Sequence, residues 1–154
     1  MTSSIFKLFG TDKVAEKTGV WINYGDVRFL CARAGGTNIH FSEAYKAKVR
    51  PYRHQIDRGT LSKEDDDKIM AELYAETVIK RVEVLVGDSV SAEGAPVIWE
   101  PGVPTADGKV LPFSRESVKA LLLDLPDMFR DLRECATDAN KYLKQAEADD
   151  VKNS

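Results

Sequence analysis

The sequence predicts an α+β fold that is mainly helical, with an N-terminal β-hairpin, a second small hairpin and about four helices. Residues 20–34, VWINYGDVRFLCARA, form two short apolar runs around Gly25-Asp26, and a glycine at the first central position suits a type II′ turn. Residues 62–85 and 125–143 repeat apolar side chains three and four residues apart, which is the period of one helix face. Residues 87–112 are rich in glycine and proline and predict loops.

The first half of the chain is expected to place short helices on either side of the hairpin. Residues 11–17 predict a short helix that stops at Gly19. Another helix begins at Asn38 or Ser42, since either side chain can cap it, and continues to about Val49. Pro51 then interrupts that helix or starts a short continuation of it.

A longer helix is predicted over residues 62–85. Ser62 is a suitable N-cap, and acidic residues 64–67 fill the first turns, where the helix dipole favours negative charge. Its apolar stripe consists of Met70, Leu73, Tyr74, Val78, Val82 and Leu85. Residues 82–86 already have the composition of a strand, so we expect the helix to end near Val86.

The second half of the chain predicts a small hairpin and two helices. Residues 97–99 are expected to pair with residues 110–111 across a turn at residues 105–108. Ser114 caps a helix over residues 115–123, and Pro126 opens the last helix at a position that tolerates a missing N–H. The last helix is expected to run to about Gln145, with an apolar stripe of Leu125, Met128, Phe129, Leu132, Cys135, Ala136, Ala139, Tyr142 and Leu143.

The predicted organisation is one globular domain with two distinct ends. Residues 1–19 form an N-terminal arm with a cluster of four apolar residues at positions 5, 6, 8 and 9. Residues 20–145 form the domain, and residues 146–154 form a flexible acidic and polar tail. Lys and Arg total 22 and Asp and Glu total 25, so the net charge is −3. This mild acidity disfavours nucleic acid and anionic membranes as partners. Cys31 and Cys135 are expected to be reduced thiols.

No residue pattern in the sequence predicts catalysis, a cofactor or a metal site. His40 and His54 lack a metal-ligand spacing, and Gly35-Gly36 lacks the lysine of a phosphate loop. Consecutive helical residues point about 100° apart, so residues 64–67 do not converge on a cation. A small metal-dependent nuclease that uses these carboxylates is the less favoured alternative. The basic residues 46–58 are expected to pair within the chain or with an acidic protein rather than with nucleic acid.

Several segments together resemble a known phage family. They are residues 8–13 (LFGTDK), 16–21 (EKTGVW), 24–26 (YGD), 32–38 (ARAGGTN), 50–53 (RPYR), 59–61 (GTL), 71–78, 112–114 (PFS), 121–122 (LL) and 125–129 (LPDMF). This set is similar to the tail assembly chaperones of long-tailed double-stranded DNA bacteriophages, and the resemblance covers roughly residues 6–143. Family members often carry a tryptophan soon after the central helix, whereas the tryptophan here is Trp99.

The resemblance implies a non-catalytic protein that binds the tape measure protein and helps to recruit tail tube subunits. It also implies a protein of the host cytoplasm that is absent from the mature virion. A structural virion protein of the neck or tail end is the alternative. For partner contact we expect Phe6 and Phe9 of the arm, which could also mediate self-association, and Met128, Phe129 and Leu132 of the last helix. Packing of that last stripe into the core against residues 62–85 is the competing interpretation.

Overall fold

The computed structural model describes residues 4–86 and 97–143. The helices are α1 (Ser4–Phe9), α2 (Lys13–Thr18), α3 (Ile39–Val49), α4 (Arg53–Arg58), α5 (Lys63–Thr77), α6 (Arg115–Asp124) and α7 (Pro126–Thr137), with 3₁₀ turns η1 (Arg50–Tyr52) and η2 (Ala139–Tyr142). The strands are β1 (Val20–Asn23), β2 (Val27–Cys31), β3 (Ile79–Val86), β4 (Ile98–Pro101), β5 (Val103–Pro104) and β6 (Val110–Leu111). The predicted α+β, mainly helical class is confirmed.

The N-terminal hairpin is confirmed and forms one side of a four-stranded antiparallel sheet of order β1-β2-β3-β4. Gly25 has φ +92°, the sign that the first central position of a type II′ turn requires. The N–H of Tyr24 donates to the carbonyl of Val27 over 2.8 Å and closes the turn. The second strand ends at Cys31, and residues 32–38 form a loop before α3.

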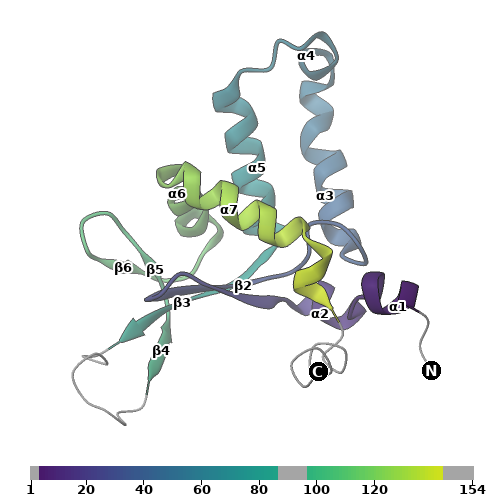
Figure 1. The fold of residues 1–154 in the computed structure, drawn as a ribbon. Coiled ribbons are helices and arrows are strands. Elements are labelled where there is room, and N and C mark those ends of the chain that lie inside the picture. The colour runs from purple at the N-terminus through teal and green to yellow at the C-terminus, as the bar shows by residue number, and fades with distance from the viewer. Residues whose placement is uncertain (1–3, 87–96, 144–154) are drawn as a thin grey trace.

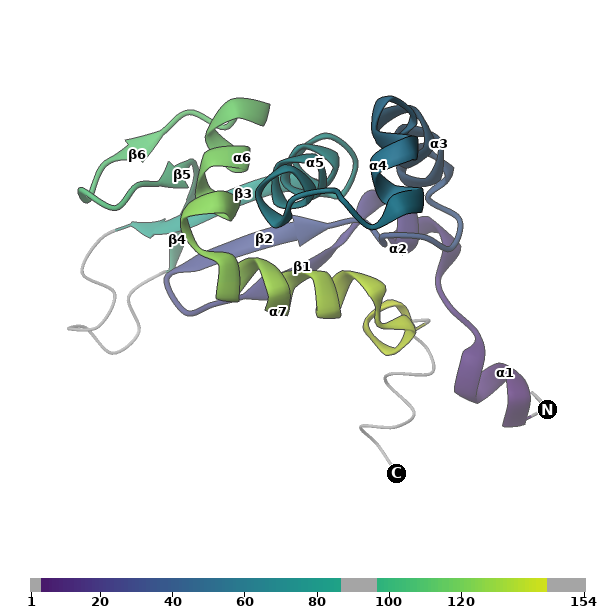
Figure 2. The ribbon, with the colours of Figure 1, turned by 90° about the horizontal axis from the view of Figure 1, so that it is seen from above.

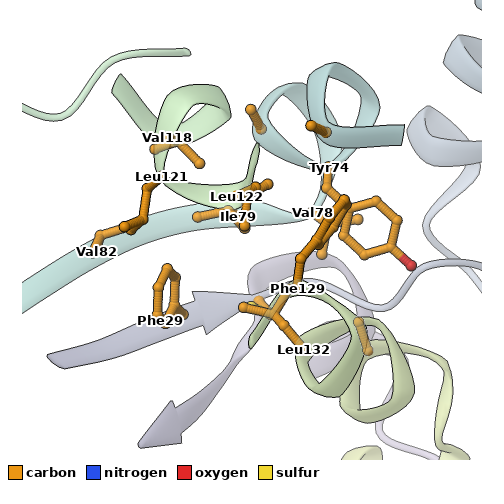
Figure 3. Packing of buried hydrophobic residues seen from close by; sticks show 14 of the residues in the cluster. Phe29, Tyr74, Val78, Ile79, Val82, Val118, Leu121, Leu122, Phe129 and Leu132 are labelled. Carbon is orange, nitrogen blue, oxygen red and sulfur yellow. The ribbon is translucent and has the colours of Figure 1, made fainter. Parts of the chain in front are cut away.

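Helices cover one face of this sheet. Figures 1 and 2 show α5, α6 and α7 on the same side of the strands, with α3 beside α5. Ile22, Phe29 and Val82, which stand in register on β1, β2 and β3, point into the buried cluster beneath these helices. The rings of Tyr74 on α5 and Phe129 on α7 meet edge to face, with their centroids 5.3 Å apart. Figure 3 shows both side chains within the core.

The helix predicted over residues 62–85 is shorter than expected, because α5 ends at Thr77 and β3 follows at once. Ser62 caps α5 as predicted, accepting a hydrogen bond from the N–H of Asp65. The strand is rich in branched side chains, which favour extended backbone. It also pairs on both sides, with β2 and with β4, and these ladders supply the hydrogen bonds that a helix would have made.

The second hairpin exists, but its predicted partner was wrong. Residues 98–101 pair with β3 instead, with Trp99 opposite Leu85 and Pro101 opposite Glu83. The hairpin partner of residues 110–111 is the short strand Val103–Pro104. The turn between them includes Gly108, whose φ is +84°. The longer strand β4 therefore pairs with β3 in the main sheet, and the shorter strand β5, which is nearer in sequence to β6, forms the hairpin with it.

The last helix is shorter than predicted. Pro126 opens α7 as expected, but α7 ends at Thr137 and the 3₁₀ turn η2 follows, so no single helix reaches residue 145. Tyr142 on η2 is fully buried, and its hydroxyl donates to the carbonyl of Cys31 over 3.0 Å.

The short helix α1 was not predicted. The helical hairpin formed by α3, η1, α4 and α5 extends away from the sheet (Figure 1).

Candidate protein-binding surfaces

The N-terminal helix α1 displays apolar side chains to solvent. Phe6 is 61% exposed and Phe9 is 73% exposed, and α1 contains no buried residue. Ile5, Leu8 and the neighbouring Val14 of α2 are also more than half exposed. Phe6, Phe9 and Val14 line a hollow of about 740 Å³ between α1 and α2. This cluster of exposed apolar side chains is the candidate contact surface on the arm.

The helix that follows α1 is tied firmly to the domain. Asp12 caps α2, because its side chain accepts from the N–H groups of Val14 and Ala15. The N–H of Asp12 donates to the carbonyl of Tyr142 over 2.7 Å, and Thr11 forms an isolated bridge with Leu143. These bonds fix the point at which α1 leaves the domain.

A buried carboxylate links α2 to the loop of residues 32–38. Glu16 is 1% exposed, and its Oε2 lies 2.7 Å from Nη1 of Arg33, while its Oε1 accepts from the Thr11 hydroxyl over 2.6 Å. The N–H of Thr37 also points at Oε2, at 3.4 Å. Burial alone would raise the pKa of Glu16, but the hydrogen bonds from Thr11 and Arg33 outweigh it and hold the pKa below its ordinary value. Glu16 is therefore a structural anion that organises the attachment of the arm.

The last helix contributes mainly to the core. Phe129 is 4% exposed and Leu132 is fully buried, and both belong to the main apolar cluster (Figure 3). Met128 is partly buried and packs against the same cluster. The structure thus assigns Phe129 and Leu132 to core packing in place of the predicted partner contact, because α7 lies across the sheet and buries that stripe. Phe6 and Phe9, by contrast, lie at the surface as predicted.

A second surface, which the sequence did not reveal, lies on the sheet face opposite the helices. The guanidinium carbon of Arg28 lies 4.1 Å from the ring centroid of Trp21 and 4.5 Å from that of Trp99. Nε and Nη2 of the same guanidinium donate to Oε1 of Glu83 over 2.8 and 2.5 Å. Oε2 of Glu83 in turn lies 2.7 Å from Nε of Arg81. One buried carboxylate therefore joins two arginines, and two indoles enclose one of them.

Part of this arrangement could have been found from the sequence. The alternation within the first hairpin places Trp21 and Arg28 on the face opposite Ile22 and Phe29. The contribution of Trp99 depends on the pairing of β4 with β3, and no local pattern specifies that pairing.

Ion pairs within the chain join α3 to α5 in the helical hairpin. Lys48 of α3 lies 3.1 Å from Glu72 and 2.7 Å from Glu76 of α5. Hydrogen bonds from Lys48 lower the pKa of both glutamates. Acidic residues 64–66 occupy the first turn of α5, as predicted. Within the described part of the chain, no group of three or more His, Cys, Asp or Glu side chains could hold a metal ion. Cys31 and Cys135 are both free thiols.

Comparison with known proteins places the chain among phage proteins. A family model described as YdaY prophage protein matches residues 36–153. No curated protein and no solved structure matches the chain. The family match supports the phage origin that the sequence resemblance implied, and its description does not mention tail assembly. Among the residues that the structure describes, no helix is long and apolar enough to cross a membrane.

Proposed function

This chain belongs to the YdaY prophage protein family, and from that premise we propose that it is a non-catalytic tail assembly chaperone. In this role it binds the tape measure protein and helps to recruit tail tube subunits in the host cytoplasm. It then leaves before the virion is complete.

The observation that supports the proposal most directly is the exposed apolar helix α1. Phe6 and Phe9 offer aromatic rings on a helix that is anchored at one end by the bonds of Asp12 and Glu16. An amphipathic helix of a partner can bury its apolar face against such side chains. A long helical protein such as a tape measure protein presents many such faces, and keeping it soluble requires that they be covered.

Co-expression with the tape measure protein of the same prophage tests this function. The intact chain is expected to move the tape measure protein into the soluble fraction and to elute with it. The double variant Phe6→Ser, Phe9→Ser is expected to lose both effects while its circular dichroism and melting temperature stay unchanged, because both rings are exposed. The variant Ile39→Ser, Val110→Ser is the matched control, since it removes exposed apolar side chains elsewhere and should retain rescue. Rescue by the Phe6, Phe9 variant would exclude the arm as the contact surface.

Mass spectrometry of purified virions separates this function from a structural role. A chaperone that leaves before completion is absent from mature particles. A protein of the neck or tail end is present at a fixed copy number in every particle, and that result would replace the proposed function. Size-exclusion chromatography with light scattering of the purified chain, with and without the Phe6→Ser, Phe9→Ser change, tests self-association through the arm.

A further inference from the structure

The face of the sheet opposite α5, α6 and α7 carries a continuous set of large side chains. Strand register places Trp21, Leu30 and Arg81 side by side on β1, β2 and β3, and Leu85 beside Trp99 on β3 and β4. Helices α5, α6 and α7 pack against the other face (Figures 1 and 2). Trp21 is 42% exposed, and Leu30, Leu85 and Trp99 are partly exposed. This set, with Arg28, Lys80 and Glu83, is called the tryptophan face below.

The tryptophan face carries a surplus of positive charge. Glu83 supplies one negative charge to two guanidinium groups, those of Arg28 and Arg81. The side chain of Arg81 is 51% exposed, so its outer edge stays accessible beyond the contact with Glu83. Lys80 is exposed at the irregularity where the register of β2 and β3 shifts, and it makes no ion pair with any described residue. An anionic partner is therefore favoured over a cationic one.

The apolar part of the tryptophan face favours a protein partner. Tryptophan and arginine are the residues that most often dominate binding energies at protein interfaces. Nucleic acid that binds to a sheet stacks its bases on open aromatic faces. Here the guanidinium of Arg28 already covers one face of each indole, at 4.1 and 4.5 Å, so the space between the rings is filled.

We propose that the tryptophan face binds an acidic amphipathic segment of a partner protein. Carboxylates of the segment pair with Arg81 and Lys80, while its apolar side chains pack on Trp21, Leu85 and Trp99. Charge complementarity identifies the partner's chemistry, and the strand register identifies the residues that contact it. This surface is separate from the arm and does not depend on a role in tail assembly.

Intrinsic fluorescence gives a direct readout, because both tryptophans of the chain lie on this face. The full chain is titrated with a tryptophan-free amphipathic helical peptide of glutamate and leucine. Parallel titrations use a lysine–leucine peptide of the same pattern and an oligothymidylate. We expect a saturable emission change with the acidic peptide that weakens as salt is added. The absence of a response to it, an equal response to the basic peptide, or tighter binding of the oligothymidylate would overturn the proposal.

Charge reversal identifies the residues that are responsible. The variant Lys80→Glu, Arg81→Glu is expected to weaken binding of the acidic peptide by about tenfold or more. The variant Arg53→Glu, Arg58→Glu changes the net charge equally on α4, away from the sheet, and should keep the original affinity. Lys80→Glu alone provides a milder test if the double variant unfolds. The Phe6→Ser, Phe9→Ser chain should bind the peptide normally, so failure of this surface and failure of the arm are distinguishable.

Discussion

The carboxylate of Glu16 occupies the space that a side chain at Gly36 would need. A Cβ atom at position 36 would lie 1.8 Å from Oε2 of Glu16 and 2.9 Å from the Arg33 side chain. The φ angle of Gly36 is +54°, which glycine adopts without steric cost. The backbone of the loop over residues 32–38 can therefore approach the Glu16–Arg33 pair closely only because position 36 has no side chain.

Gly36→Ala should destabilise the protein through two effects. The positive φ costs about 1–2 kcal/mol for a residue with a side chain, and displacement of the Glu16 carboxylate brings the total to about 2–4 kcal/mol. Gly59→Ala is the matched control, because Gly59 also has a positive φ of +67° but its added Cβ would meet no atom within 4 Å. Urea unfolding of both variants measures the difference, and equal losses of stability would mean that the close approach to Glu16 is not important.

The contribution of Glu16 should depend on pH. Because the folded-state pKa of Glu16 lies below its ordinary value of 4.5, ionised Glu16 stabilises the fold fully above that value. As pH falls through the folded pKa, that contribution is lost. The free energy of unfolding of the wild type should exceed that of Glu16→Gln by about 1–3 kcal/mol at neutral pH, and the gap should close in acid.

The acid effects of Glu72 and Glu76 are present in both proteins and so cancel in this comparison. Chemical denaturation over a series of pH values gives the measurement. A gap that stayed constant down to pH values well below 4.5 would contradict the assignment of Glu16 as the anion of this network.

Alanine substitutions along α7 should distinguish its buried side chains from its partly exposed ones by their effect on stability. Leu132→Ala and Phe129→Ala each remove a buried side chain and should cost about 2–5 kcal/mol. Met128→Ala should cost clearly less, because Met128 is only partly buried. Melting temperatures from thermal unfolding rank the three variants by their loss of stability. If Met128→Ala were the most damaging of the three, the described packing of α7 would be wrong.

Removal of the Arg28 guanidinium should loosen the edge strand β4. Arg28→Met abolishes two hydrogen bonds to Glu83 and the contacts with both indoles, with an expected loss of about 2–3 kcal/mol. Amide hydrogen exchange should accelerate at residues 98–100 of β4 more than in β2. Lys109→Met, which removes an exposed cation from the β5–β6 turn, is the control and should leave β4 protection unchanged.

Local patterns were sufficient for elements whose stability is local. The hairpin turn at Gly25, the Ser62 and Ser114 caps and the start of α7 at Pro126 follow from side chains within a few residues. Local composition indicated a strand only at residues 82–86, and the full strand over residues 79–86 was missed because it depends on pairing with β2, far away in the sequence. For the same reason the pairing of residues 98–101 with β3 could not be predicted from local patterns.

The candidate surfaces show a similar division. The arm was predictable because Phe6 and Phe9 stand in a short polar stretch that cannot bury them locally. Phe129 and Leu132 have an equally apolar pattern, and only tertiary packing decides that they face the sheet. The Arg28 contacts bring together residues from four strands, so spacing in the sequence contains little information about them.

The pairing of Cys31 with Ile79 has a consequence for folding kinetics. Everything between these two residues belongs to the helical hairpin and its flanking loops, so joining β2 to β3 from a disordered chain would carry the loop-closure entropy of that whole insertion. If α3 and α5 associate first, they bring β2 and β3 together before the strands pair. The ring centroids of Phe41 on α3 and Tyr74 on α5 lie 5.9 Å apart in this contact. Substitutions at that helical contact should therefore slow refolding, whereas substitutions in β4 should mainly accelerate unfolding. The inserted hairpin thus determines how fast the sheet can form.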